Sequence, residues 1–158
     1  MSTTGRGLRR WLKSTSNRTF VVYPLLLVLV EFLLQRGTLR INFWSVPLLV
    51  WGYLQYRLVG NYRLREGGGG PGMSVPPERL VTSGPYRYTR NPMYLGHIIF
   101  MLGLALVLSS WLAALLLLFH LFWFNERAKE DEEQMHRLFG ALYDTYVARV
   151  RRWIPFVY

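Results

Sequence analysis

The chain has 158 residues, about one domain, and 51% of them are hydrophobic. It contains no cysteine, which excludes disulfides and thiolate metal sites, and His97, His120 and His136 are too scattered to indicate any metal site. The net charge is +10, but the arginines gather at the ends of apolar runs, a pattern that is typical of contact with anionic lipid and argues against nucleic acid as a partner.

The first segment, residues 1–19, is polar and basic. The apolar run after it leads to Glu31 and Arg36, without a small-residue cleavage site, so the sequence favours a retained segment over a signal peptide. Residues 8–16 are consistent with either a short interfacial helix or a frayed basic tail.

Two apolar runs follow, at 20–34 and 41–56, and the short connection between them predicts an antiparallel pair of membrane spans. Glu31 is the one charged residue in the first run. A carboxylate inside a span is costly unless it faces the protein interior, and the favoured interpretation is that Glu31 reaches out to the membrane edge.

The 35 residues from Asn91 to Asn125 include no Asp, Glu, Lys or Arg. One helix of that length would run about 52 Å, against a hydrocarbon core of about 30 Å, so the run is expected to fold back at Ser109-Ser110. This gives spans at about 93–108 and 111–126. The predicted fold is therefore all-α, a polytopic membrane bundle of about four transmembrane helices.

Basic residues set the expected orientation. Five lie in the N-terminal segment, six in 57–90 and six from Arg127 onward, whereas the remaining loops carry only Arg36 and Arg40. Both termini and the central loop are therefore expected on the cytoplasmic side of a multi-pass protein.

The predicted organisation has four parts. A basic segment covers 1–19, a transmembrane pair covers 20–57, a flexible Gly-rich loop covers 58–75, and a module with a transmembrane hairpin and a helical tail covers 76–158.

Local signals mark the helix ends within this module. Asn91 is a good N-cap, and Pro92 occupies the favoured first position of the third span, whose N-terminus suits a carboxylate or phosphate. The fourth span is expected to continue past the membrane to Gly140, and a short helix is expected over 141–150.

Two motif segments flank the apolar hairpin. The first is Leu80-Val81-Thr82-Ser83-Gly84-Pro85-Tyr86 leading into Arg90-Asn91-Pro92-Met93-Tyr94-Leu95-Gly96. The second runs from Arg127 through Glu133 and continues with Phe139-Gly140, Tyr143, Tyr146, Val150 and Ile154-Pro155. In this order they resemble the isoprenylcysteine carboxyl methyltransferase family, whose C-terminal module the membrane phospholipid methyltransferases share. The resemblance covers about residues 76–157.

This resemblance implies an S-adenosylmethionine-dependent methyltransferase whose methyl donor enters from the cytoplasm. It also implies a lipophilic acceptor, such as an isoprenylated cysteine carboxylate, a phospholipid amine or another lipophilic acid. It assigns Arg127 and Arg90 to catalysis on the substrate side. It assigns cofactor binding to Glu78, Arg79, Leu80, Val81, Tyr86, Asn91, Pro92, Met93, Tyr94, Asp131 and Glu132.

The chain departs from the family pattern at two positions. Asn91 stands where the family commonly has histidine, and Asp131-Glu132 stands where it commonly has Glu-Glu. Asparagine still caps a helix but carries no charge, and the acidic run 130–133 leaves the register open by one residue.

The chemistry of methyl transfer agrees with the residues present. Transfer from a sulfonium needs positioning and charge complementarity, and a carboxylate acceptor needs no catalytic base. Aromatic faces such as Tyr86 and Tyr94 suit the cationic centre, and Asp131 or Glu132 suits the donor's ammonium or ribose hydroxyls.

Each feature alone has a simpler explanation. Asn91-Pro92 is typical of an ordinary helix start, the acidic run of a solvated face, and the tyrosines of an aromatic belt, while His97 is more often packed than catalytic. Gly96 and Gly103 are expected to allow close helix approach.

The co-occurrence of the two motif segments favours an enzyme. A non-catalytic membrane scaffold remains the alternative, because Asn91 replaces histidine. A small transporter is disfavoured by the scarcity of ionisable residues in the spans.

Overall fold

A computed structural model describes residues 7, 9, 11–70 and 75–153, and every regular element in these ranges is helical. The predicted all-α class is confirmed. The elements are α2 (Thr15–Asn17), the π-helix η1 (Arg18–Val22), α3 (Tyr23–Leu34), the 3₁₀-helix η2 (Phe43–Ser45), α4 (Val46–Gly67), the 3₁₀-helix η3 (Gly84–Arg87), α5 (Pro92–Val107), α6 (Trp111–Phe139) and α7 (Ala141–Arg149). Leu8, Pro71-Gly72 and Ile154-Pro155, on which some expectations rested, lie outside the described residues.

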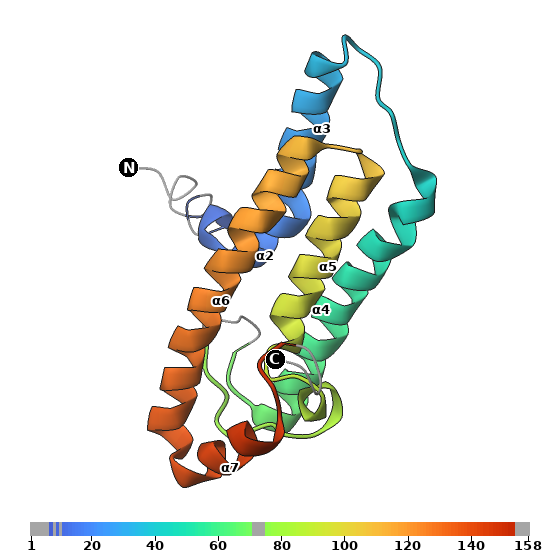
Figure 1. Ribbon diagram of the computed structural model, residues 1–158. Helices are drawn as coiled ribbons and strands as arrows, with labels where there is room; N and C mark the ends of the chain where they lie inside the picture. The colour runs from blue at the N-terminus through green and yellow to red at the C-terminus, as the bar shows by residue number, and fades with distance from the viewer. Residues whose placement is uncertain (1–6, 8, 10, 71–74, 154–158) are drawn as a thin grey trace.

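The four long helices form a bundle in which α5 packs against both α4 and α6 (Figure 1). The α5–α6 turn lies at the same end of the bundle as the end of α3, and α7 lies at the opposite end, below the foot of α4 and α5. Among the described helices, Thr15–Leu34 is long and apolar enough to cross a membrane, and Pro92–Val107 is apolar but shorter.

Glycines bring α4 and α5 into close contact, the most extensive helix pairing of the described chain. A Cβ atom at Gly52 would lie 2.4 Å from the backbone nitrogen of Phe100, and one at Gly96 would lie 2.9 Å from the backbone oxygen of Gly52. A Cβ at Gly103 would lie 2.8 Å from the backbone nitrogen of Leu49. The expected role of Gly96 and Gly103 in close approach is confirmed.

The hairpin of α5 and α6 turns where the sequence predicts. Ser109 adopts a positive φ of 47°, and the Ser110 hydroxyl accepts a hydrogen bond from Ala113 N at 3.1 Å, which caps α6. At the other end α6 stops at Gly140, whose φ is 50°.

The interpretation that Glu31 reaches the membrane edge is wrong. Its side chain faces the protein and is only 6% exposed. The carboxylate accepts hydrogen bonds from the Ser110 hydroxyl and from Gln35 Nε2. These partners satisfy the oxygens inside the protein, so Glu31 ties α3 to the start of α6.

The second apolar helix differs from its predicted bounds at both ends. Residues 38–42 are not helical and α4 begins at Val46, while its C-terminal part extends through residues 58–67, which were expected to be a flexible loop. The extension buries Val59, and the Gly67 carbonyl accepts from the backbone N–H groups of Glu78 and Arg79 at 2.8 and 2.9 Å. Tertiary contacts therefore stabilise these last turns.

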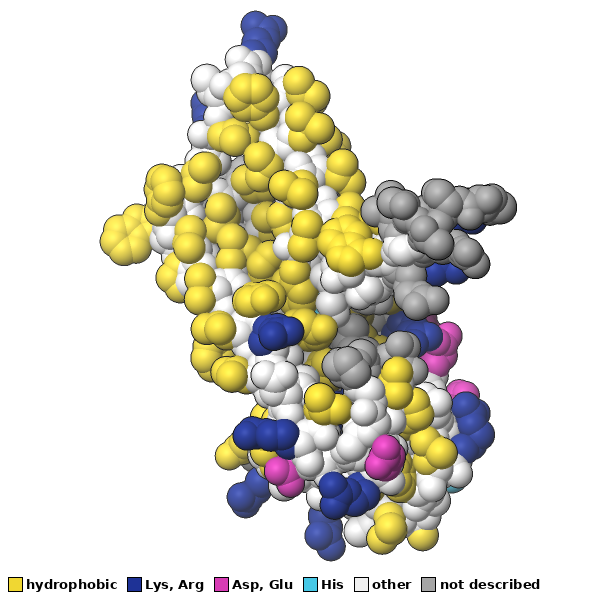
Figure 2. Space-filling model, turned by 180° about the vertical axis from the view of Figure 1, so that it is seen from behind, with side chains coloured by type: hydrophobic (Ala, Val, Ile, Leu, Met, Phe, Trp, Pro, Cys, Tyr) yellow, Lys and Arg dark blue, Asp and Glu magenta, His cyan; other side chains and the backbone are white. Residues whose placement is uncertain are grey.

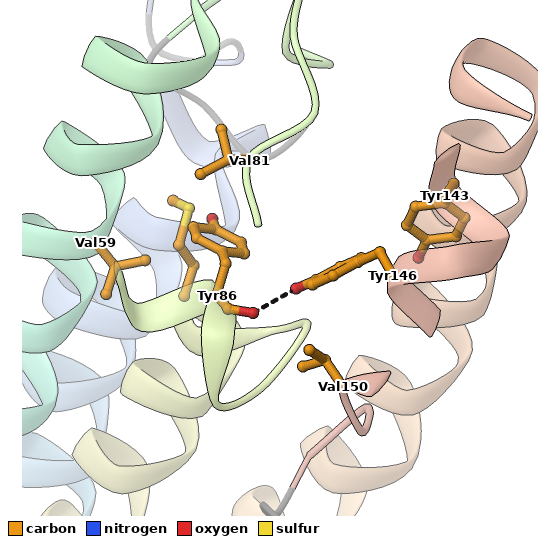
Figure 3. Packing of buried hydrophobic residues seen from close by; sticks show 7 residues of the cluster. Val59, Val81, Tyr86, Tyr143, Tyr146 and Val150 are labelled. Atoms are coloured by element: carbon orange, nitrogen blue, oxygen red, sulfur yellow. Dashed lines mark hydrogen bonds between the residues drawn. The ribbon is translucent and has the colours of Figure 1, made fainter. Parts of the chain in front are cut away.

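The core at the α7 end joins three segments that are far apart in the sequence (Figure 3). Val59 comes from α4, Val81 and Tyr86 from the loop before α5, and Tyr146 and Val150 from the C-terminal tail. The Tyr146 hydroxyl donates to the Tyr86 carbonyl at 2.7 Å. This core fixes the tail against the loop and the foot of α4.

Candidate functional site

A pocket opens at the α7 end of the bundle, between the loop before α5, the first turn of α5 and the part of α6 that extends beyond the hairpin. Its lining is mixed, with apolar and aromatic side chains beside two arginines and two carboxylates. The lining residues are Arg63, Pro76, Pro77, Leu80, Val81, Tyr86, Arg90, Asn91, Met93, Tyr94, Asp131, Glu132, Gln134, Met135, Tyr143 and Tyr146.

The loop wall of the pocket is held by buried groups. Tyr86 lies in η3 and is buried, and its backbone is fixed by the bond from Tyr146. Burial raises the pKa of Tyr86 to about 12 and the pKa of Tyr143, beside Glu132, to about 12. Both hydroxyls therefore stay protonated at neutral pH and present neutral rings to the pocket.

The start of α5 forms the second wall. Pro92 is the first residue of the helix and Asn91 occupies the N-cap position, as predicted, but the Asn91 side chain makes no capping hydrogen bond. Its amide instead donates to the Arg152 carbonyl at 3.4 Å. Met93 and Tyr94 are buried in the first turn and line the pocket.

Asp131 faces Tyr94 across the pocket. The Tyr94 hydroxyl donates to Asp131 Oδ2 at 2.6 Å, and Arg127 NH2 lies 3.7 Å from Asp131 Oδ1. Desolvation by burial raises the pKa of Asp131, and the hydrogen bond from Tyr94 and the charge of Arg127 oppose this shift only in part. Asp131 is therefore a partly desolvated carboxylate that accepts one strong hydrogen bond, from Tyr94.

Glu132, the next residue, has different partners. Both of its oxygens accept from the Arg152 guanidinium, from Nε and NH2 at 2.9 Å each, and Arg90 NH1 lies 3.4 Å away. This is the two-pronged geometry of a strong arginine–carboxylate pair. Although Glu132 lines the pocket, its charge is balanced by two guanidiniums from the protein.

Comparison with known proteins finds a similarity in the same region. The model of the family described as Phospholipid methyltransferase matches residues 69–141, which include the loop, the hairpin and the extension of α6. Over these residues the chain is similar to this family. The matched residues include every pocket-lining segment except α4 and the tail.

Three curated relatives match about half of the chain. Protein-S-isoprenylcysteine O-methyltransferase of Schizosaccharomyces pombe is 34% identical over 79 residues, 49% of this chain and 34% of the relative. Protein-S-isoprenylcysteine O-methyltransferase B of Arabidopsis thaliana is 32% identical over 80 residues, 50% of this chain and 41% of the relative. The Saccharomyces cerevisiae protein of the first name is 33% identical over 79 residues, 49% of this chain and 33% of the relative.

The chain thus spans well under half the length of these curated relatives. No solved structure matches it. The predicted resemblance to a methyltransferase family is confirmed.

Within the family module, the structure brings most of the predicted site residues together. Leu80, Val81, Tyr86, Arg90, Asn91, Met93, Tyr94, Asp131 and Glu132 all line the one pocket. Four others do not. Glu78 and Arg79 are exposed on the loop, and the Pro92 carbonyl accepts from Gln55 Nε2 at 3.0 Å on the α4 side. Arg127 is outside the lining but interacts with two lining residues, Asp131 and Tyr94, and it pairs with Glu130 at 2.7 Å.

Sequence reasoning did not assign several lining residues. Arg63 was missed because α4 was expected to end near Arg57, although Arg63 lies within the helical continuation. Tyr143 and Tyr146 were included in the second motif segment but were given no role in the site, and the hydrogen bond from the Tyr146 hydroxyl to the Tyr86 carbonyl crosses 60 positions of sequence. The spacing of two aromatic residues three positions apart within 141–150 was the signal in the sequence that these side chains share one buried face.

Proposed function

We propose that the protein is an integral membrane methyltransferase that uses S-adenosylmethionine and methylates a carboxylate, or another nucleophile, on a lipophilic acceptor. One observation carries the proposal. The two family motif segments, one before the apolar hairpin and one after it, meet at a single pocket, where Tyr94 donates to Asp131 at 2.6 Å.

The residues of the pocket fit the proposed donor. Asp131 offers a carboxylate to the donor's ammonium or ribose hydroxyls, and the rings of Tyr86 and Tyr94 suit a cationic sulfur. Val81 and Met135 give apolar surface for an adenine ring. The N-terminus of α5 suits the donor's own carboxylate.

The donor supplies a methyl group on a positively charged sulfur, so that a carbon–sulfur bond breaks with its electron pair left on sulfur as the acceptor's oxygen forms the new bond to carbon. A carboxylate acceptor uses a lone pair that is already free, and no proton has to be removed. The chain therefore needs groups that orient, shield and neutralise, and it needs no general base.

The chain offers two arginines for the acceptor's negative charge. Arg90 lines the pocket, and its side chain is 11% exposed. Arg127 lies at the edge beyond Asp131 and is 36% exposed. We assign Arg90 to the reacting group and Arg127 to the mouth of the site, where an entering carboxylate or phosphate would pass.

An exposed apolar belt supports a place in the membrane. Figure 2 shows hydrophobic side chains over most of the upper part of one face, with charged side chains gathered at the lower end and a few at the opposite tip. Leu33 on α3 is 66% exposed, Trp44 before α4 is 94% exposed, and Phe122 on α6 is 69% exposed. Monomeric soluble proteins rarely expose contiguous apolar surface of this kind. We therefore propose a multi-pass protein with both termini and the pocket in the cytoplasm.

The names of the relatives favour an isoprenylcysteine, which would be methylated on a carboxylate oxygen, as the acceptor class. A phospholipid amine is the rival acceptor, because the matching family model is described as that of phospholipid methyltransferases.

The test is incubation of the purified protein in lipid nanodiscs with donor labelled on the methyl group. A farnesylated cysteine peptide and phosphatidylethanolamine serve as parallel acceptors. A methyl ester releases labelled methanol in base, whereas a methylated amine keeps its label. Base-labile label on the peptide is the expected result. Calorimetric titration with S-adenosylmethionine is run alongside. A chain that binds no donor is a scaffold, and the proposal then fails.

A further inference from the structure

The C-terminal tail lies alongside the loop that leads into α5. The backbone N–H of Arg90 donates to the Arg151 carbonyl at 2.9 Å, and the Thr89 hydroxyl donates to the Arg152 carbonyl at 2.8 Å. The Asn91 amide reaches the same carbonyl at 3.4 Å. Residues 89–91, which include two pocket-lining side chains, are therefore held by the backbone of residues 151–152.

The same tail is attached to α6. The Arg152 guanidinium makes its two-pronged pair with Glu132, and the Trp153 indole N–H donates to Asn125 Oδ1 at 3.2 Å. Arg152 thus joins three segments, because its carbonyl binds the loop, its side chain binds α6, and its backbone belongs to the tail. Arg152 does not line the pocket.

This connection matters because of how α5 and α6 are built. The two helices are linked covalently only by the turn at residues 108–110, at the end of the hairpin away from the pocket. At the pocket end, the α5 side carries Arg90 and Asn91, and the α6 side carries Asp131. Cross-links at this end set the distance between the two walls. Besides the hydrogen bond from Tyr94 to Asp131, Glu132 supplies one by facing Arg152 and Arg90 together.

We propose that Arg152 is a positioning residue for the methyl donor, acting through Glu132 to hold the α5 wall of the pocket against the α6 wall. The inference rests on the proposed function. It also assigns Glu132 a place in the frame of the site and leaves Asp131 as the carboxylate that faces the ligand.

The pair is well suited to this task. The Arg152 and Glu132 side chains are 22% and 14% exposed, so water and salt screen their interaction only in part. A guanidinium that grips both carboxylate oxygens fixes direction as well as distance, which a lysine ammonium does not.

The test compares Arg152→Gln, Arg152→Lys, Glu132→Gln and the double variant with the unaltered chain. Arg149→Gln is the matched control, because it removes the same charge from an exposed site at the end of α7. Donor affinity is measured by calorimetry with S-adenosylmethionine, and turnover is measured with the labelled donor. Because truncating one partner of a hydrogen-bonded charge pair is costly, we expect Arg152→Gln to weaken donor binding by about tenfold or more.

The double variant decides between positioning and a general structural role. If Arg152 acts through Glu132, Arg152→Gln has no further effect on donor affinity in the Glu132→Gln background. The donor affinity of Arg152→Lys should lie between that of the unaltered chain and that of Arg152→Gln. In both variants the KM for donor should change more than kcat. Circular dichroism identifies any variant that does not fold. If Arg152→Gln does not fold, donor affinity is compared between Arg152→Lys and the unaltered chain.

The failures of the two proposals are distinct. An unaltered chain that binds no donor overturns the proposed function. Donor binding that is equal in the unaltered chain and a folded Arg152→Gln, or losses that add in the double variant, overturns this inference alone.

Discussion

Two adjacent carboxylates of the pocket have opposite surroundings. Asp131 accepts a hydrogen bond from Tyr94 and can accept further hydrogen bonds from a ligand in the pocket. Both oxygens of Glu132 already accept hydrogen bonds from Arg152. Sequence comparison could indicate that an acidic pair belongs here, but not which member faces a ligand. Neighbouring helix positions point about 100° apart, so their partners depend on the segments packed on each side. The partner Arg152 lies 20 positions away in a segment whose path the sequence did not define.

Replacement of Asp131 by asparagine tests the ligand-facing carboxylate. The change keeps the shape and removes the charge, and we expect donor affinity to fall by about 10- to 100-fold, as for loss of a charged hydrogen bond. Titration calorimetry measures it. Glu133→Gln, an equal change at a side chain that is 73% exposed, should leave affinity unaltered. Equal losses in both variants would indicate an effect of net charge and not of a site.

The raised pKa of Asp131 predicts how donor binding depends on pH. Burial favours the protonated form, so the charge of Asp131 is lost at a higher pH than that of a solvated aspartate, whose pKa is about 3.9. Donor affinity should therefore be highest near neutral pH. As the pH is lowered, the affinity should begin to fall at a pH that is higher than the pKa of a solvated aspartate. Calorimetry across a pH series gives the midpoint. In Asp131→Asn this step should vanish, and a step that persists belongs to another group.

At the scale of elements, the helix ends that carry local signals were predicted best. Pro92, Ser110 and Gly140 mark the start of α5, the start of α6 and the end of α6, and the helix bounds follow them closely. The extension of α4 was missed because nothing local requires it. Its end depends on Gly67 accepting hydrogen bonds from a loop that returns 11 residues later. The position of Glu31 depended in the same way on Ser110, which is 79 positions distant.

Gly52→Ala tests the close contact of α4 with α5. The new methyl group would meet backbone atoms of Phe100 and Gly96 at 2.4 and 2.7 Å, so the helices have to separate. Overpacking of this kind costs about 1–3 kcal/mol, and we expect a lower thermal midpoint in detergent. Gly60→Ala on the same helix is the control, because its methyl would meet only the flexible end of Met93 at 3.4 Å. It should be neutral or stabilising, by up to about 1 kcal/mol of helix propensity. Equal midpoints for both variants would contradict the packing argument.

For the whole molecule, the distribution of charge and apolar surface determines how the bundle would sit in a bilayer. The pocket and α7 lie at one end, where Figure 2 shows charged side chains gathered on that face, and the α5–α6 turn and the end of α3 lie at the other. The sequence predicted this polarity from counts of arginine and lysine alone. The resemblance implied a pocket between the two motif segments, but local signals in the sequence could not show the contacts by which the tail folds back on the loop.

The absence of cysteine from the chain allows a direct test of topology. Thr38→Cys and Ala148→Cys place single exposed thiols at opposite ends of the bundle. In intact cells, a maleimide that cannot cross membranes should label the first variant, and it should label the second only after permeabilisation. Labelling of both from one side would rule out the proposed orientation. Labelling of both after permeabilisation verifies that each thiol is reactive.

The 16 residues of α5 span about 24 Å, which is less than the hydrocarbon thickness of an average bilayer, about 30 Å. A short helix beside α6, which has 29 residues, would draw the lipid leaflets together locally. Thinning of the leaflets at this side of the bundle would shorten the path from the acyl chains to the mouth of the pocket. Acyl-chain length in a reconstituted membrane should therefore affect how easily the proposed lipophilic acceptor reaches the pocket, and shorter lipids should favour its access.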